Sequence, residues 1–285
     1  MKDFFQILGV VALLMLSFFY TEEAITVVRN FDDLMTKIKE EKGNYEIEPI
    51  DAVIINDEII PGLNGKAVNE NKSYRNMKRV NEFNPNLLEY TQVKPNISLE
   101  KNFQKYIVSG NPKKKMVSLL FLVNGEVEIE NILEILKQKK IKGNFFIDGN
   151  WLEENNDQVN QIAKEGHLIG NLGYDFQYVD TNFTWLNTTI KQLTKQQNNY
   201  CYKEIKNIDD LKICTVYKNY TINPNLVIDN DPLKQIKDKI AAGFLISFSI
   251  NDQLLDELGV IINYIKAKGY EITTLDEHLS EMLEY

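Results

Sequence analysis

The chain of 285 residues is poor in the side chains that most often bind transition metals. It contains two histidines, His167 and His278, which lie far apart, and two cysteines, Cys201 and Cys214. Imidazole and thiolate are the usual zinc ligands in proteins, so a site built from several neighbouring histidines is not expected. For both histidines we favour a structural role, with His167 packed or hydrogen-bonded beside a buried strand and His278 on a surface helix.

Positive charge is also in deficit. Lysine and arginine together number 32 against 41 acidic residues, which gives a formal net charge of -9. Phosphates would be repelled by such a chain rather than neutralised, so nucleic acid and anionic surfaces are disfavoured as partners. A neutral glycan remains compatible with this charge.

The N-terminus carries one long apolar run. Residues 4–20, FFQILGVVALLMLSFFY, are apolar except for Gln6 and Ser17. A run of roughly 17 to 20 such residues can reach across the bilayer core, which indicates a signal anchor or a signal peptide. The small residues of a cleavage site are replaced by Phe18, Phe19 and Tyr20, so we favour an uncleaved anchor in residues 1–24 with the main domain outside the cell.

Residues 25–111 predict a small α+β module and linker. A helical apolar stripe is followed by two short strands at 52–55 and 58–60 around a turn at Asn56-Asp57, and a second helix is expected from Ser73 to Lys78. The stripe consists of Phe31, Leu34, Met35 and Ile38.

The second helix of this module carries a basic cluster. The cluster, Lys72, Arg75, Lys78 and Arg79, could contact an anionic wall polymer such as teichoic acid. A solvated helix face is the interpretation that we favour.

Residues 113–176 predict the architecture of the rest of the chain. Residues 117–123 are a nearly unbroken apolar run, which is typical of a strand covered on both faces. A helical stripe at 129–136 and a second apolar run at 145–147 follow, and the pattern repeats with a helix at 151–165 and a strand at 168–170. Such βα alternation predicts a parallel sheet, open or rolled into a barrel, with its site at the C-terminal ends of the strands.

Three segments resemble the NodB-type polysaccharide deacetylases. The family has an apolar strand before T-F-D-D-G-P, then A-T-F-F-x-x-G-x-W, then E-G-H-x-I-G-N-H-S/T-x-x-H. The corresponding segments here are Leu119-Leu120-Phe121, NFFIDGNW at 144–151 and EGHLIGN at 165–171. The resemblance spans about residues 115–285 and implies an α/β fold, an irregular (β/α) barrel of the NodB type, for a domain at 112–285.

The order of PGLNG at 61–65, SYRNM at 73–77 and this domain is also similar to that of membrane-anchored Gram-positive proteins with a NodB-like domain.

The metal and catalytic groups implied by the resemblance are missing. In the family, two aspartates after the first strand act as general base and metal ligand, and two histidines complete the metal site. An arginine of an R-P-P-x-G motif supports the catalytic aspartate. A last histidine is the general acid. The family positions hold Leu122, Val123, Asn124, Leu172, Phe176 and Ser249, and Tyr200-Cys201-Tyr202-Lys203 lies where the arginine motif is expected. Hydrocarbon side chains offer no lone pair to a cation, so neither a metal nor another cofactor is expected.

The two cysteines, Cys201 and Cys214, are separated by twelve residues. In the oxidising compartment that the anchor implies, a disulfide is expected. A catalytic thiol is not expected, because no histidine is predicted nearby to lower its pKa.

Polar side chains still gather at the predicted strand ends. They could bind a sugar by stacking and hydrogen bonding, or they could merely cap strands and turns. An all-oxygen metal site of Asp148, Asp175 and Asp252 is a disfavoured alternative. The ligand-binding candidates are Asn124, Asp148, Asn171, Tyr174, Asp175, Ser249, Asn251 and Asp252.

These features predict a single-pass protein of the cell membrane with an extracellular, catalytically inactive deacetylase-like domain. Its expected partner is cell-wall glycan or a protein of the cell envelope. Two alternatives stay open, an active metal-dependent carbohydrate N-deacetylase with relocated ligands and a purely structural or regulatory interaction protein.

Overall fold

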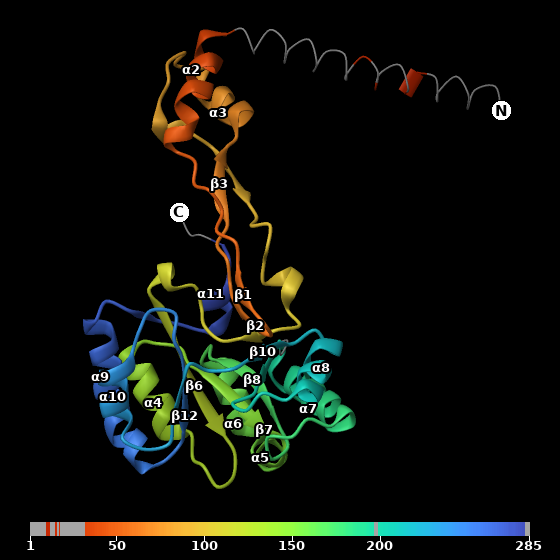
Figure 1. Ribbon diagram of the computed structural model, residues 1–285, viewed down its shortest axis with the longest axis vertical. Coiled ribbons are helices and arrows are strands. Elements are labelled where there is room, and N and C mark those ends of the chain that lie inside the picture. The colour runs from red at the N-terminus through yellow and green to blue at the C-terminus, as the bar shows by residue number, and fades with distance from the viewer. Residues whose placement is uncertain (1–9, 12–14, 16, 18–31, 197–198, 283–285) are drawn as a thin grey trace, which may run out of the picture. The chain divides into compact units, whose positions relative to one another are not determined.

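The computed structural model describes residues 10–11, 15, 17, 32–196 and 199–282 and divides into two compact units (Figure 1). Unit 1 comprises Met1–Pro49 and Asn64–Val93, and unit 2 comprises Ile50–Leu63 and Lys94–Tyr285. Most of the expected anchor at residues 4–20 lies outside the described residues. Within the described part of the chain, no helix has the length and apolar character needed to cross a membrane.

Unit 1 is built on two capped helices. The carboxylate of Asp32 caps α2 by accepting from Leu34 N at 2.9 Å, and the Asn69 side chain caps α3 by accepting from Lys72 N at 3.0 Å. Three residues of the predicted apolar stripe, Leu34, Met35 and Ile38, are buried with Tyr74 and Met77 of α3. The fourth, Phe31, lies outside the described residues. The elements are α2 (Asp33–Glu41), η1 (Lys42–Asn44), α3 (Glu70–Met77), η2 (Pro85–Leu87) and an antiparallel pair of strands, β3 (Gly65–Val68) and β4 (Tyr90–Val93).

Unit 2 contains one curled sheet in the strand order β1-β2-β5-β10-β9-β8-β7-β6-β12-β11, with β13 paired to β6. Along this path only the β1–β2 hairpin is antiparallel. The strands are β1 (Val53–Ile55), β2 (Glu58–Ile60), β5 (Tyr106–Ile107), β6 (Met116–Val123), β7 (Asn144–Asp148), β8 (Leu168–Gly173), β9 (Tyr200–Tyr202), β10 (Tyr220–Ile222), β11 (Leu226–Ile228), β12 (Leu245–Ser249) and β13 (Glu271–Ile272).

The sheet curls but does not close into a full barrel. Its end strands, β1 and β11, each pair with only one neighbour in the described chain, so the sheet is a half-barrel. The strands predicted at 52–55 and 58–60, assigned from sequence to the N-terminal module, lie in this large sheet as β1 and β2. The helices of unit 2 are η3 (Glu100–Asn102), η4 (Pro112–Lys114), α4 (Glu130–Lys139), α5 (Gly149–Glu154), α6 (Asn156–Lys164), α7 (Asp180–Thr194), α8 (Ile208–Val216), α9 (Pro232–Lys239), α10 (Asp252–Ala267) and α11 (Leu275–Leu279).

Side chains of β6 alternate between two separate hydrophobic layers. Phe121 and Val123 belong to an outer layer that the helices α4 and α10 cover, whereas Leu120 and Leu122 belong to an inner layer enclosed by the curled sheet. Both layers are buried, which explains why this strand reads as an unbroken apolar run. The inner layer also contains Phe146 of β7, Leu172 of β8, Tyr202 of β9 and Leu245 of β12.

His278 belongs to the buried core and not to a surface helix as the sequence analysis expected. Helix α11 turns Leu275, His278 and Leu279 inward near the start of β6, and the Nδ1 atom of His278 lies 2.9 Å from Ser118 Oγ. A Cβ atom at Gly110 would lie 2.2 Å from His278 Nε2, so only glycine fits beside the ring. Burial lowers the pKa of His278 to about 3.

His167 has the packed, hydrogen-bonded structural role that was predicted. Its Nδ1 atom accepts from Gly143 N at 3.1 Å, and its ring meets the ring of Phe145 edge-on at 5.3 Å. Burial, with a smaller contribution from the charge of Lys142, lowers the pKa of His167 to about 4. Both histidines therefore lie where strands begin, at the opposite end from the expected site.

The buried histidines predict acid sensitivity of the fold. An unfolded histidine binds a proton near pH 6.5, whereas folded His278 resists protonation until about pH 3, so the unfolded state binds more protons between these values. The free energy of unfolding should fall as the pH drops through this window, by about 1 kcal/mol for His278 between pH 7.5 and 5.5.

Urea unfolding at the two pH values measures this effect. In the variant His278→Gln the difference between pH 7.5 and pH 5.5 should shrink by about 1 kcal/mol. An unchanged difference would show that His278 does not resist protonation in the fold.

Candidate functional site

The candidate site is the mouth of the half-barrel, where β6, β7, β8 and β12 end. These strands are hydrogen-bonded neighbours, so their C-terminal ends meet at one edge. Inward-facing side chains at this edge include Leu122, Leu172, Tyr202 and Ser249. Ser249 lies directly opposite Leu122 in the strand register.

At the end of β6, only some of the residues at family positions face the mouth. Leu122 is buried in the inner layer, whereas Val123 points into the outer layer between sheet and helices. Asn124 follows the strand directly and is half-buried, and the alternation of β6, extended by one residue, assigns it to the inner side. Leu122 therefore forms the inner side at the end of this strand, and Asn124 is the next position of the same alternation.

At the end of β8, hydrocarbon fills the position where the family has its first metal-binding histidine. Leu172 is 0% exposed and packs in the inner layer with Phe146 and Tyr202. The second position, Phe176, is 38% exposed. The cluster that would hold a cation in the family is thus split between a buried leucine and a surface phenylalanine.

Phe176 lies in a tight turn with unusual backbone angles. Tyr174 and Gln177 exchange two backbone hydrogen bonds, and Asp175 and Phe176 between them have φ values of 50° and 62°. Two consecutive left-handed residues form the kind of turn that favours Asn-Gly, so a bulky phenylalanine here requires support from outside the turn.

Lys203 supplies much of that support. Its ammonium group donates to Phe176 O at 2.5 Å, pairs with Asp210 Oδ2 at 2.6 Å and lies 4.9 Å from the centre of the Tyr178 ring. The two charged side chains are 11% and 14% exposed, so the pair is largely withdrawn from water and from salt screening. Lys203 therefore ties the turn after β8 to helix α8.

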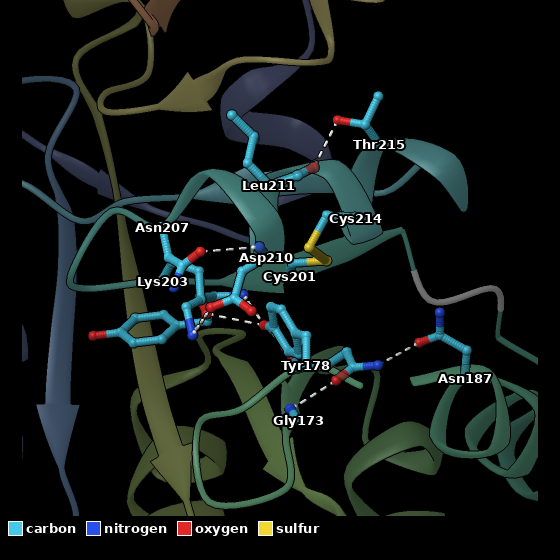
Figure 2. Close-up of a disulfide and its surroundings, with 12 residues drawn as sticks. Gly173, Tyr178, Asn187, Cys201, Lys203, Asn207, Asp210, Leu211, Cys214 and Thr215 are labelled. Carbon is cyan, nitrogen blue, oxygen red and sulfur yellow. Dashed lines mark hydrogen bonds and ion pairs between the residues drawn. A yellow bond between two sulfur atoms is a disulfide. The ribbon is translucent and has the colours of Figure 1, made fainter. Parts of the chain in front are cut away.

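The predicted disulfide forms beside this lysine. Cys201 of β9 is bonded to Cys214 of α8, and both sulfur atoms pack with Tyr178 and Phe183 in a small buried cluster (Figure 2). The Tyr178 hydroxyl accepts from Tyr202 N at 2.9 Å and has Asn171 O and Tyr202 O within donating distance. Burial raises the pKa of Tyr178, so the phenol stays neutral.

Asp148 and Asn171 make hydrogen bonds within the fold that hold neighbouring elements together. Asp148 caps α5 by accepting from Asn150 N at 2.8 Å, and its other oxygen accepts from Asp175 N at 2.6 Å. Burial raises the pKa of Asp148, although these hydrogen bonds oppose the shift. Asn171 is buried on the side of α7, where it donates to Asn187 Oδ1 at 2.9 Å, and does not face the mouth.

Tyr174 joins the turn to the helices around it. Its hydroxyl donates to Glu153 Oε1 at 2.9 Å, and its ring lies 6.1 Å from the ring of the exposed Trp185. A Cβ atom at Gly149 would come within 2.1 Å of this ring, so the ring packs directly against the start of α5. Burial raises the pKa of Tyr174, and the Glu153 carboxylate adds to the shift.

The end of β12 is polar and internally hydrogen-bonded. Ser249 Oγ donates to Asp229 Oδ1 at 2.5 Å, and Asn251 Nδ2 donates to Asp229 O at 2.8 Å while its Oδ1 caps α10. Asp229 was not singled out from the sequence, although an aspartate directly after the strand at 226–228 could have indicated it. Lys203 and Asp210 were likewise missed as a pair, because only folding brings them together.

The residues at the mouth do not fit a divalent cation. Among the described residues, no group of three histidine, cysteine, aspartate or glutamate side chains could hold a metal ion. Asp148 and Asp175 are adjacent, but Asp252 lines a groove with Asn131 and Glu134 outside the barrel, so the all-aspartate alternative is not assembled.

Comparisons with known proteins agree with this architecture. The polysaccharide deacetylase family profile matches residues 109–238. The uncharacterized protein YlxY of Bacillus subtilis is 30% identical over 283 residues, covering 91% of this chain and 88% of its own.

Solved structures of BA3943 from Bacillus anthracis are also similar. The wild-type protein, described as a carbohydrate esterase family 4 pseudoenzyme, has a TM-score of 0.69 and 27% identity and covers 89% of this chain and 97% of its own. A mutant of BA3943 with the same TM-score is described as having restored enzymatic activity. The fold, the matched segments and these relatives together show that the chain belongs to the polysaccharide deacetylase family, carbohydrate esterase family 4.

Proposed function

We propose that this protein is a catalytically inactive deacetylase-like protein that binds cell-wall glycan at the barrel mouth, anchored outside the cell by residues 4–20. The observation that carries the proposal is Leu172. A fully buried leucine stands at a metal-histidine position, within a continuous apolar inner layer. A cation placed there would lose its hydration without gaining a ligand.

The groups that would move protons in the family are also replaced. The strand that ends in a catalytic histidine in the family ends here in Ser249, whose hydroxyl is held by Asp229 at 2.5 Å. A serine has no pKa near neutrality with which to protonate a leaving amine. Inactivity is supported further by the likeness to BA3943, which is described as a pseudoenzyme.

Glycan binding is supported by the surface around the turn at 174–177. The exposed ring of Phe176 and the half-exposed Trp185 offer apolar faces on which a pyranose can stack. Asn124 and the Ser249–Asp229 pair provide polar groups for sugar hydroxyls at the neighbouring strand ends. The Lys203 bond to the turn fixes Phe176 before a ligand arrives, which lowers the entropic cost of binding.

Retention on insoluble peptidoglycan tests the proposal with the full chain in neutral detergent. Truncation in Phe176→Ala should weaken retention by roughly 2- to 13-fold, because an aromatic contact contributes about 0.5 to 1.5 kcal/mol. The matched control is Val260→Ala, an exposed apolar side chain on α10. If the wild-type protein is not retained and appears in the flow-through, the glycan proposal is wrong. The remaining candidate partner is then a protein of the cell envelope.

A variant with metal ligands restored at the family positions tests whether the backbone of the mouth can still form a metal site. Introducing Asn124→Asp, Leu172→His and Phe176→His returns a carboxylate and two imidazoles to the family positions. If the turn at 174–177 can bring position 176 to position 172, one zinc ion should bind, as read by isothermal titration calorimetry. Replacing the buried Leu172 should also cost about 2 to 5 kcal/mol of stability, so circular dichroism must first confirm folding. A folded variant without zinc affinity would show that the turn is not placed to close a metal site.

A further inference from the structure

Three exposed cations on and just after α3 have no acidic partner among the described residues. They are Lys72, Arg75 and Arg79, and the exposed Val80 follows them. The helix buries its other side, with Ser73, Tyr74 and Met77. We call the surface of Lys72, Arg75, Arg79 and Val80 the α3 basic face.

Neighbouring cations of unit 1 are neutralised by ion pairs, which sets this face apart. Lys42 pairs with Glu70 at 2.7 Å, and Lys78, which the sequence analysis grouped with the cluster, pairs with Asp32 at 2.7 Å. Lys37 lies 3.0 Å from Glu41. The cations of the α3 basic face are therefore left over after local pairing.

Arginine is rare in this protein, and its distribution is uneven. Lysine and arginine total 32, yet the sequence contains only Arg29, Arg75 and Arg79 as arginines. Two of these stand four positions apart on the α3 basic face. The guanidinium fork matches the geometry of a phosphate better than an ammonium group does, so arginine at an unpaired surface position points to a phosphate-bearing partner.

We propose that the α3 basic face binds an anionic phospholipid surface. The chain itself favours this occupant, since the apolar run ends at Tyr20 and α2 begins at Asp33. The intervening residues 21–32 can span at most about 40 Å, so with residues 4–20 in the bilayer unit 1 stays near the headgroups. Val80, which is 61% exposed, adds an aliphatic side chain of the kind that enters the interface.

The overall charge of -9 does not prevent this contact. Charges are screened over about 8 Å at physiological ionic strength, so a headgroup senses the local face and not the whole protein. Each cation near an anionic membrane contributes roughly fivefold to association, the equivalent of about 1 kcal/mol, and three together contribute on the order of 100-fold. Tethering raises the local concentration further, so this modest affinity suffices.

Hydrogen–deuterium exchange of the full chain tests the proposal by reading residues 70–82 directly. The protein is reconstituted into vesicles of phosphatidylcholine alone or with about one third phosphatidylglycerol. Exchange of residues 70–82 should slow only on the anionic vesicles, and 0.5 M sodium chloride, whose screening length is only about 4 to 5 Å, should abolish the protection.

The triple variant Lys72→Gln, Arg75→Gln, Arg79→Gln should lose this protection. The matched control removes the same charge from exposed lysines of unit 2, Lys137→Gln, Lys164→Gln and Lys234→Gln, and should keep it. Equal exchange on both vesicles, or protection retained in the first variant, would overturn the proposal. Protection by soluble polyglycerol phosphate but not by anionic vesicles would overturn it in favour of a wall polymer. None of these readouts depends on the glycan site of unit 2.

Discussion

Side-chain alternation along β6, β8 and β12 is the constraint that determines the chemistry of the barrel mouth. It places Leu122, Leu172 and Ser249 on the inner side of the mouth, and the two leucines extend the inner hydrophobic layer to the ends of their strands. Ligands for a cation would have to come from these inward positions, because outward positions such as Val123 are buried against helices. Hydrocarbon at the inward positions therefore changes the chemistry of the mouth while leaving the packing of the sheet intact.

The loop after β8 is held in a defined shape beside these hydrocarbon side chains. Asp175 and Phe176 keep a left-handed turn that costs conformational energy, and that turn is held by the Asp148 carboxylate on one side and by the Lys203 ammonium on the other. The Cys201–Cys214 disulfide and the Lys203–Asp210 pair both join β9 and the loop after it to α8. These contacts fix the shape of the turn, as a preformed binding surface requires.

Much of unit 2 was predictable because its strands are buried on both faces and its helices have clear apolar stripes. The runs at 117–123 and 145–147 and the stripe at 129–136 follow from local patterns and are present in the structure. The disulfide was expected from the cysteine count and from the compartment that the predicted anchor implies, and it is also present. The short strands β5, β9 and β10 were missed, since two or three residues carry too little periodicity to reveal a strand.

The site was less predictable, because it depends on the direction in which each side chain points and on contacts between residues far apart in the sequence. Sequence position alone cannot tell that Asn171 faces α7 or that Lys203 finds Asp210 and Phe176 O. His278 was misplaced for a related reason. Five residues of α11 are too few to show which side is buried, and the space beside Gly110 becomes visible only in the fold.

The most direct test of the central claim is the metal content of the folded wild-type chain. Full-length protein saturated with zinc and then dialysed would be analysed by elemental mass spectrometry, alongside titration calorimetry on the same sample. The account predicts no stoichiometric zinc and no saturable heat, because the inner positions at the mouth hold leucine. One equivalent of zinc retained after dialysis, and lost on substitution of residues at the mouth, would contradict it.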